Sequence, residues 1–480
     1  MAEIQLDQIP ESTLKPGVYF EFNTKLARNS LPTNLQRVLI YGQRLDSGWV
    51  PALKLVDVFN DKDAAVYFGA GSIAHRMVIA AIEANPNAQI SVIAVDDDVS
   101  AHEAQWRLDF PAKAQVAPGI LTVEIGKESV SVGLDVGMNG GAIAYAVIDA
   151  IKGRPDLPVT AFSATDSQME TGGVIFHAKN KGEAGRQIRI AFVTRTSTGA
   201  SGTVLLTSQT GDRDPDLRPA YAAAFGASHE IRVCPFASKE ALLAFRSHLE
   251  ELGSPLEQRD AIGIAGTAGT LAAATTIAPE INCRIMSLGW YNKSKCTGGE
   301  IAAGYAAVMA SEEHPARPLD TLEIKGLDVT DQEDKPGRKE QENALHNGVT
   351  PIVVGPGNRV QIVRAISTYL VDEQNIPDDT CLDITVFRTL HYFRKACRQA
   401  IAKRFPRELL SDKTPPKVRT VILEVAYACQ DMEILQNIDQ YKDQLVVQKH
   451  GHNKGMCVAA IPAPIVHGMH VFAGRIDLIV

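Results

Sequence analysis

The sequence lacks the paired cysteines of a disulfide framework and the clustered cysteines of a zinc site. Its cysteines are seven in number and scattered, and no two have the spacing Cys-x-x-Cys. They are Cys234, Cys283, Cys296, Cys381, Cys397, Cys429 and Cys457. Several lie beside apolar residues, where a free thiol packs as a small hydrophobic group. This pattern predicts free thiols in a reducing compartment.

Long apolar runs and an excess of basic residues are also absent. No stretch approaches the roughly 18 to 20 uninterrupted apolar residues of a membrane span. The segment Met1–Gln5 is polar and acidic, unlike the start of a signal peptide. The formal net charge is -8, so we expect neither membrane insertion nor direct nucleic-acid binding. The length of 480 residues, with 45% hydrophobic and 22% charged residues, is typical of a folded protein of about two to four domains.

Familiar catalytic motifs are missing as well. The sequence has no Gly-x-Ser-x-Gly, no His-Glu-x-x-His and no Walker phosphate-binding loop, and spacing alone assigns no Ser/His/Asp or paired-carboxylate set. We therefore expect no catalytic residues, no cofactor and no metal. The segment His450-Gly451-His452, followed by Cys457, offers three metal ligands, but no fourth is evident nearby. A solvated turn at the tip of a hairpin is the favoured interpretation.

One glycine-rich segment resembles a dinucleotide-binding loop. Gly69 and Gly71 are followed about 25 residues later by three acidic residues, Asp96–Asp98, where a ribose-binding carboxylate would lie. The fingerprint requires a strand before the first glycine, whereas residues 60–67 are typical of a capped helix. We therefore expect Gly69 to end one helix and Ser72 to begin the next. An NAD(P)-dependent oxidoreductase remains the alternative function.

A second glycine-rich segment, Gly263–Gly269, lies between a predicted strand and a predicted helix. Its spacing is Gly-x-x-Gly-x-x-Gly, which does not supply the tight first turn of the nucleotide loop. Small residues also follow it, which suits close packing. A structural role is favoured.

Strands and helices alternate over much of the chain, which predicts an α/β layer with parallel strands. The expected strands are 36–42, 90–95, 231–233, 262–264 and 285–288, and the expected helices are 72–84, 239–252, 270–277 and 300–309. Between them, residues 119–195 have the alternation of hairpins around a short helix at 141–151, which indicates an inserted β-rich module. The charged segment 328–341 is predicted to be a linker or exposed loop. A last α+β domain follows, with a strand at 360–367, two helices, and a hairpin from 444–447 to 456–461.

Isolated apolar strands are expected near both ends of the chain. Residues 17–23 place Val18, Phe20 and Phe22 on one face. Residues 470–480 do the same with the side chains Phe472, Ile476, Leu478 and Val480. Such strand edges pair either within their own fold or with another copy of the protein.

A basic helix is expected over residues 386–404. Its apolar face consists of Val386, Leu390, Phe393, Cys397 and Ile401. The remaining positions carry the basic side chains Arg388, His391, Arg394, Lys395, Arg398, Lys403 and Arg404. This ridge is either a solvated face or a docking surface for an acidic partner, where complementary charge sets the register. Nucleic acid is a less favoured partner because no aromatic platform accompanies the ridge.

The order of several segments resembles a contractile tail sheath protein of the Mu-like phage class. The collinear set covers essentially the whole chain, although each motif alone is weak. It comprises Gln8–Pro10, Lys15–Tyr19, Glu21–Asn23, Gln36–Gln43, Phe68–Ser72, Pro315–Leu322, Arg364–Tyr369 and Leu382–Ile384. A related phage-tail-like bacteriocin or secretion particle would share these segments.

This resemblance implies stacked hexameric rings that form a helical sheath around an inner tube. It implies that an N-terminal arm (Val18, Tyr19, Phe20, Phe22) and a C-terminal strand (Phe472, Ile476, Leu478) complete the sheets of neighbouring copies. It also implies that the basic helix (Arg388, His391, Arg394, Lys395, Arg398, Lys403) faces the tube. Further implied partners are baseplate and tail terminator proteins. The implied location is a virion tail assembled in the host bacterial cytoplasm.

The resemblance also implies a domain plan and a mode of action. The plan has an arm at 1–30, a central α/β domain at 31–118 and 196–327, an outward-facing module at 119–195, a tube-proximal domain at 328–468 and a linking strand at 469–480. Rigid domains would rotate about the arms as the sheath contracts, driving the tube through an envelope without nucleotide or metal.

Overall fold

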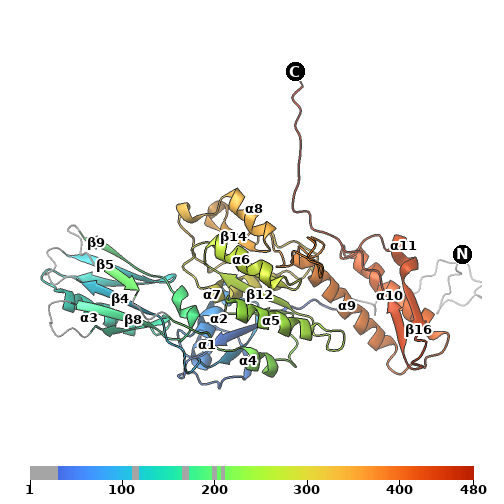
Figure 1. The fold of residues 1–480 in the computed structure, drawn as a ribbon, viewed down its shortest axis with the longest axis horizontal. Coiled ribbons are helices and arrows are strands. Elements are labelled where there is room, and N and C mark those ends of the chain that lie inside the picture. Colours follow the sequence, from blue (N-terminus) through green and yellow to red (C-terminus); the bar gives the residue numbers. More distant parts are fainter. Residues whose placement is uncertain (1–30, 111–117, 165–171, 197–202, 207–210, 480) are drawn as a thin grey trace, which may run out of the picture. The chain divides into compact units, whose positions relative to one another are not determined.

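The computed structural model describes residues 31–110, 118–164, 172–196, 203–206 and 211–479, and the chain divides into two units (Figure 1). One, here called the sheet unit, contains Asn34–Tyr392 and the final segment from Ile465. The other, the helical unit, contains Phe393–Pro464. The division falls within one long helix, so the domain boundary expected at residue 328 lies instead near residue 392.

An eight-stranded sheet forms the centre of the sheet unit, in the order β15-β14-β13-β12-β11-β1-β3-β2. Its strands are β1 (Arg37–Gln43), β2 (Leu55–Val58), β3 (Gln89–Val95), β11 (Ile231–Val233), β12 (Ile262–Thr267), β13 (Met286–Trp290), β14 (Thr350–Val354) and β15 (Val360–Ile362). The six strands from β14 to β3 are parallel, and the two edge strands are antiparallel to their neighbours. The predicted parallel α/β layer is therefore confirmed.

Helices cover both faces of this sheet. They are α1 (Asp61–Phe68), α2 (Ile73–Ala84), α4 (Arg218–Ala223), α5 (Lys239–Leu252), α6 (Leu271–Ile281), α7 (Gly298–Ser311) and α8 (Arg338–His346). A Cβ atom on Gly263 would meet α5, whereas one on Gly266 would lie 2.8 Å from the backbone nitrogen of Ala302 in α7. Residues three apart in a strand point to opposite faces, so α5 and α7 lie on opposite sides of β12.

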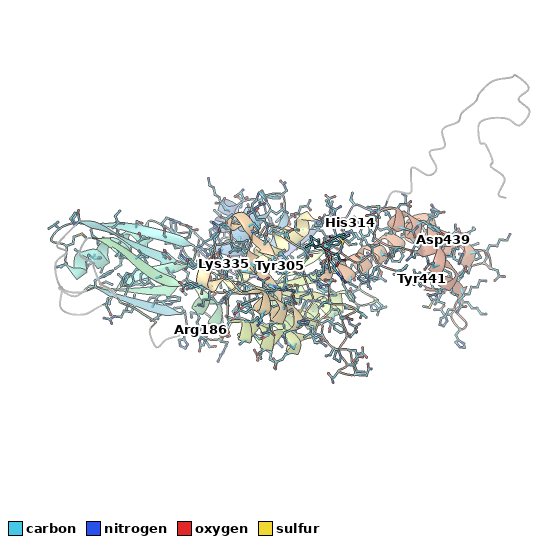
Figure 2. All side chains as sticks on the ribbon, turned by 90° about the horizontal axis from the view of Figure 1, so that it is seen from above. Arg186, Tyr305, His314, Lys335, Asp439 and Tyr441 are labelled. Atoms are coloured by element: carbon cyan, nitrogen blue, oxygen red, sulfur yellow. The ribbon has the colours of Figure 1, made fainter. Side chains whose placement is uncertain are left out.

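The last two strands of the sheet depart from the domain plan expected from the sequence. The sequence predicts that residues 350–362 belong to a separate C-terminal domain, but β14 pairs with β13 and its Ile352 is fully buried in the main core. The charged segment 328–341, predicted to be a linker or exposed loop, is a loop with one short 3-10 turn, Gln332–Asp334, only as far as residue 337, and its last four residues begin α8. Tyr305 of α7, labelled in Figure 2, is buried, and its hydroxyl lies 3.0 Å from Oγ of Ser287 in β13.

The inserted module has a hydrophobic core of its own. One sheet has the order β10-β4-β8-β7 and the other β6-β5-β9. The elements are β4 (Gln105–Phe110), β5 (Gly119–Ile125), β6 (Glu128–Leu134), α3 (Gly140–Lys152), β7 (Val159–Ser163), β8 (Gly172–Ala178), the 3-10 helix η2 (Glu183–Gln187), β9 (Ile190–Thr196) and β10 (Thr203–Leu206). Because β4 and β10 lie outside 119–195, the module is wider than the sequence predicted.

The helical unit contains the end of α9 and a short hairpin. Its elements are α9 (Ile384–Arg404, entering from the sheet unit), α10 (Thr414–Asp431), α11 (Ile438–Tyr441), the 3-10 turn Lys442–Gln444, β16 (Val446–Lys449) and β17 (Cys457–Ala460). Cys397 and Cys429 are buried in this unit. Asp439 and Tyr441 mark α11 in Figure 2, where Asp439 accepts a 2.9 Å hydrogen bond from the Tyr427 hydroxyl. Among the described residues, no helix is both long and apolar enough to cross a membrane.

Candidate assembly surfaces

The C-terminal tail, residues 471–479, presents apolar side chains to solvent. Phe472 is 84% exposed, Ile476 is 98% exposed and Leu478 is 87% exposed. The tail is extended, and no strand of the described chain pairs with it (Figure 1). Contiguous apolar side chains that remain exposed indicate a surface that another molecule covers. The predicted N-terminal arm, with Val18, Tyr19, Phe20 and Phe22, lies outside the described residues.

The hairpin of β16 and β17 is a second incomplete element. Its strands pair antiparallel from Val446 with Ala460 to Lys449 with Cys457, as the sequence predicted. Arg419 of α10 supports it by donating to the carbonyl oxygens of Leu445 and Lys442 at 2.9 and 2.7 Å. A two-stranded sheet is marginally stable by itself, and no other strand of the described residues pairs with either outer edge of this one.

The basic helix α9 departs from the prediction at its first two basic positions. The guanidinium of Arg388 is buried and donates to the carbonyl oxygen of Glu312 at 2.6 Å. His391 lies 3.6 Å from a carboxylate oxygen of Asp260, and burial lowers its pKa to about 4. Arg388 therefore closes the end of α7, and His391 is neutral at pH 7. The prediction that these two residues belong to an exposed basic ridge is wrong.

The remaining basic residues of α9 are closer to the surface. Arg394 and Lys395 are half-buried, whereas Arg398 and Lys403 are exposed. Arg404 pairs with Glu424 of α10 at 2.6 Å. A smaller basic surface, centred on Arg398 and Lys403, thus remains a candidate contact with an acidic partner.

The first glycine-rich segment has the helix-capping geometry predicted for it. Gly69 ends α1 with φ 87°, and its N–H bonds to the Ala65 carbonyl. Ser72 begins α2, where its hydroxyl accepts from the N–H of His75. A helix, not a strand, precedes the glycines, so the loop meets helix C-terminal carbonyls in place of the N–H groups that a pyrophosphate needs.

The second glycine-rich segment serves close packing. Gly266 faces the start of α7, where a Cβ atom would lie 2.5 Å from the carbonyl oxygen of Gly298. Thr270 then caps α6 by accepting from the N–H of Ala273. The predicted structural role is confirmed.

The hairpin tip holds its histidines in a turn. Nδ1 of His450 accepts from the backbone N–H groups of His452 and Asn453 at 3.2 and 3.0 Å. Within the described ranges, no group of three or more His, Cys, Asp and Glu side chains is placed to hold a metal ion. The geometry is that of a turn stabilised by its own imidazole.

An ionic cluster that the sequence analysis missed lies at the base of the C-terminal tail. His470 is the last residue before the tail, and its side chain is 11% exposed. Its Nδ1 lies 2.5 Å from Asp320 Oδ2, and its Nε2 lies 3.4 Å from Asp383 Oδ1. The three residues are far apart in sequence, and no spacing pattern connects them.

Two family models match the chain. The model described as the phage tail sheath protein central domain matches residues 213–368, and that described as the phage tail sheath C-terminal domain matches residues 377–479. Together they cover more than half of the chain. The chain is also similar to the Mu-like prophage FluMu tail sheath protein of Haemophilus influenzae, with 26% identity over 494 residues and 99% of each sequence covered.

Solved structures are similar to the chain at low sequence identity. A chain of the six-fold symmetrised baseplate of the anti-feeding prophage has a TM-score of 0.50 and 10% identity, covering 98% of this chain and 100% of that chain. A sheath tail protein of Desulfitobacterium hafniense has a TM-score of 0.49 and 13% identity, covering 90% of this chain and 93% of that chain.

Proposed function

From the premise that this chain belongs to the phage tail sheath family and is a subunit of a contractile tail sheath, we propose that its copies join by exchanging terminal strands. The observation that carries the proposal is the C-terminal tail, whose Phe472, Ile476 and Leu478 stay exposed within a single copy. Burying such side chains contributes roughly 1.5–3 kcal/mol each. A neighbouring copy that covers the tail would gain this contribution.

The hairpin of β16 and β17 is the acceptor we propose for the tail of a neighbouring copy. Its strands are largely exposed, no other described strand pairs with them, and the edge of a β-sheet can accept an added strand through backbone hydrogen bonds. Addition of one tail would convert a marginal two-stranded sheet into a three-stranded one. The N-terminal arm, with Val18, Tyr19, Phe20 and Phe22, is proposed to act in the same way.

Strand exchange of this kind builds a polymer. The donor tail and the acceptor hairpin are different surfaces, so each copy binds one neighbour through each of them. We propose that the contacts close into hexameric rings that stack into a helical sheath around an inner tube. Baseplate and tail terminator proteins would then cap the two ends of a virion tail assembled in the host cytoplasm.

The smaller basic surface of α9 is the proposed contact with an acidic tube. Arg398 and Lys403 are exposed, and exposed ion pairs contribute only about 0.2–1 kcal/mol each. Contacts of this strength position the sheath and still break when the subunits move. The inserted module, with its separate core, would face outward.

Contraction needs no chemistry in this proposal. The subunits assemble in an extended state, and each ring that switches releases the next as domains rotate about the exchanged strands. The contracted state would bury more surface between domains, and this difference drives the tube through an envelope. No nucleotide, metal or catalytic residue is required.

The proposal is tested by placing a photo-crosslinker, benzoylphenylalanine, at position 472. Sheaths grown from a mixture of isotopically light and heavy chains are irradiated, digested and examined by mass spectrometry. We expect crosslinks between position 472 of one chain and the 446–460 region of another. Crosslinks confined to peptides of the same chain would overturn strand exchange.

Truncation gives an independent test. Removing residues 1–24 or residues 471–480 should leave a folded chain that no longer forms long sheaths in negative-stain electron microscopy. A full-length variant replaces Phe472, Ile476 and Leu478 by serine. It keeps the backbone of the tail but removes its apolar side chains, and we expect it to form shorter sheaths. A truncated chain that polymerises like the intact one contradicts the proposal.

A further inference from the structure

The C-terminal tail begins at a fixed point on the sheet unit. His470 lies between two carboxylates, 2.5 Å from Asp320 and 3.4 Å from Asp383, whereas every described residue after it is exposed. The chain therefore passes within one residue from an ion-paired anchor to a solvated tail. Hydrogen bonds between charged partners are roughly twice as strong as neutral ones.

Both carboxylates are themselves held in place. Asp383 accepts two hydrogen bonds from Arg364, at 2.8 and 2.9 Å, and it lies immediately before α9. Asp320 follows Leu319, which is buried. The residue after it, Thr321, donates its backbone N–H to the carbonyl oxygen of Ile362 in edge strand β15. The anchor for His470 is thus attached to the main sheet and to the start of α9.

A close backbone contact adds to the ionic one. A Cβ atom on Gly468 would lie 2.3 Å from Cγ of Pro318. Only glycine allows the chain to pass this closely over Pro318 on its way to His470. Residues Pro318, Asp320, Arg364 and Asp383 come from three of the segments that carry the family resemblance, and they meet here.

We propose that these four residues, His470, Asp320, Asp383 and Arg364, form a tail clamp that fixes the base of the exchanged strand. The inference rests on the strand exchange proposed above and names the residues that make the exchange mechanically effective. A tail held at its base searches a smaller volume for the neighbouring hairpin, which raises its effective concentration there. A pull on the tail is passed to the sheet unit, not to the hairpin just before it in the chain.

Charge at the clamp agrees with this role. The hydrogen bond to Asp320, together with the nearby carboxylate of Asp383, raises the pKa of His470 to about 9, so the imidazole is a cation at neutral pH. Burial acts to raise the pKa of Asp383, but the nearby imidazolium of His470 and the hydrogen bonds from Arg364 outweigh it and lower that pKa to about 2. The charged groups facing His470 are Asp320 and Asp383, with Arg364 behind Asp383.

The first part of the test measures the clamp in the dilute full-length chain. NMR titration of the histidine-labelled protein, with His470 assigned from the spectrum of His470→Ala, should give a pKa near 9. Asp320→Asn should lower it by about one unit or more, since it removes the nearer carboxylate. A His470 that titrates near 6.5 in the intact chain would show that the clamp does not exist in solution.

The second part measures assembly by the length of sheaths in electron micrographs. His470→Ala and Asp320→Asn should shorten sheaths about twofold or more at pH 7, and His470→Lys, which keeps the cation, should restore much of the length. The matched control is His467→Ala, because His467 is exposed three residues earlier. Position 320 lies outside the tail, and asparagine has nearly the same volume as aspartate. If a His470 variant does not fold, the sheath length of Asp320→Asn therefore tests the clamp by itself.

The outcomes separate the clamp from strand exchange. If His470 titrates near 9 but both clamp variants grow sheaths of normal length, the clamp is not the anchor and strand exchange stands. If removal of residues 471–480 leaves sheaths unchanged, strand exchange itself is wrong, and the anchoring role fails with it. Shortened sheaths in the clamp variants, with His467→Ala unaffected, support the proposal.

Discussion

The guanidinium of Arg388 in α9 donates a 2.6 Å hydrogen bond to the carbonyl oxygen of Glu312, just beyond the last turn of α7. It also lies 3.4 Å from the carbonyl oxygen of Met309. Helix ends leave carbonyls unsatisfied and carry partial negative charge, so a buried cation there serves as a cap supplied from elsewhere in the chain. Burial nevertheless lowers the pKa of Arg388 to about 10.

Replacing Arg388 by methionine should therefore destabilise the sheet unit. We expect the free energy of unfolding to fall by about 1–3 kcal/mol, because the α7 carbonyls lose their buried donor. Urea unfolding followed by tryptophan fluorescence measures this directly, since all three tryptophans, Trp49, Trp106 and Trp290, lie in the sheet unit. Arg407→Met, at an exposed position beyond α9, is the control and should change stability by less than about 0.5 kcal/mol.

The buried ion pair between α2 and α7 supplies a second prediction. Arg76 lies 2.6 Å from Glu300, which also accepts from the N–H of Thr297 at the start of α7. Glu300→Ala should cost about 3–5 kcal/mol, because it leaves a buried cation without its partner. The double variant Arg76→Met with Glu300→Leu should lose much less, since neither charge remains buried. Equal losses in the single and double variants would contradict this account.

The tail clamp predicts a pH dependence with a definite sign. The folded-state pKa of His470, about 9, lies above its ordinary 6.5, so its contribution is complete below pH 6.5 and is lost as pH rises through 9. The folded-state pKa of Asp383, about 2, lies below its ordinary 3.8. The contribution of Asp383 to the free energy of unfolding is therefore lost as pH falls from 3.8 through 2. The stability difference between the intact chain and His470→Gln should be greatest from about pH 4 to 6.5, at about 1–2 kcal/mol. A difference that does not vary with pH would count against the ion pair.

Charge reversal tests the smaller basic surface of α9. Arg398→Glu combined with Lys403→Glu should leave sheath polymers intact but weaken their binding to purified inner tubes, most strongly at low salt. Co-sedimentation with tubes at several salt concentrations measures this. Arg338→Glu with Lys339→Glu reverses the same charge on exposed positions of α8 and should leave tube binding unchanged. Equal binding by both reversed chains would exclude α9 as the tube-facing surface.

The dinucleotide alternative makes its own prediction. Gly69 follows helix α1, so we expect no site for a pyrophosphate and no rise in melting temperature with millimolar NADH or NADPH. A bound nucleotide at about 100 times its dissociation constant would stabilise the chain by about 2.7 kcal/mol. A saturable rise in melting temperature would therefore revive the oxidoreductase hypothesis.

Local patterns predicted most of the secondary structure. The helix Lys239–Leu252 and the strand Ile231–Val233 have the bounds that apolar periodicity gave them. The capping roles of Gly69 and Ser72 were also predictable, because a helix cap depends on a few adjacent residues. The hairpin of β16 and β17 followed from alternation around a polar turn.

Burial of charge was not predictable from the same patterns. Arg388 and Arg398 occupy the same helix, and periodicity alone placed both away from the apolar stripe. The structure buries Arg388 because the end of α7 lies against the first turns of α9, while Arg398 remains exposed. The environment of a side chain depends on what packs against its helix. For Arg388 this is the end of α7 at Glu312, which lies 76 residues away in sequence.

By itself, the sequence determined that this chain is a mixed α/β protein with an apolar C-terminal segment, because periodicity and composition act over neighbouring residues. It also carried the collinear segments that resemble tail sheath proteins. Only the tertiary structure decided that β14 and β15 complete the main sheet, and that Asp320, Asp383 and His470 meet at the base of the tail. Those contacts join residues up to 150 positions apart, and their geometry depends on the folded sheet to which they are attached.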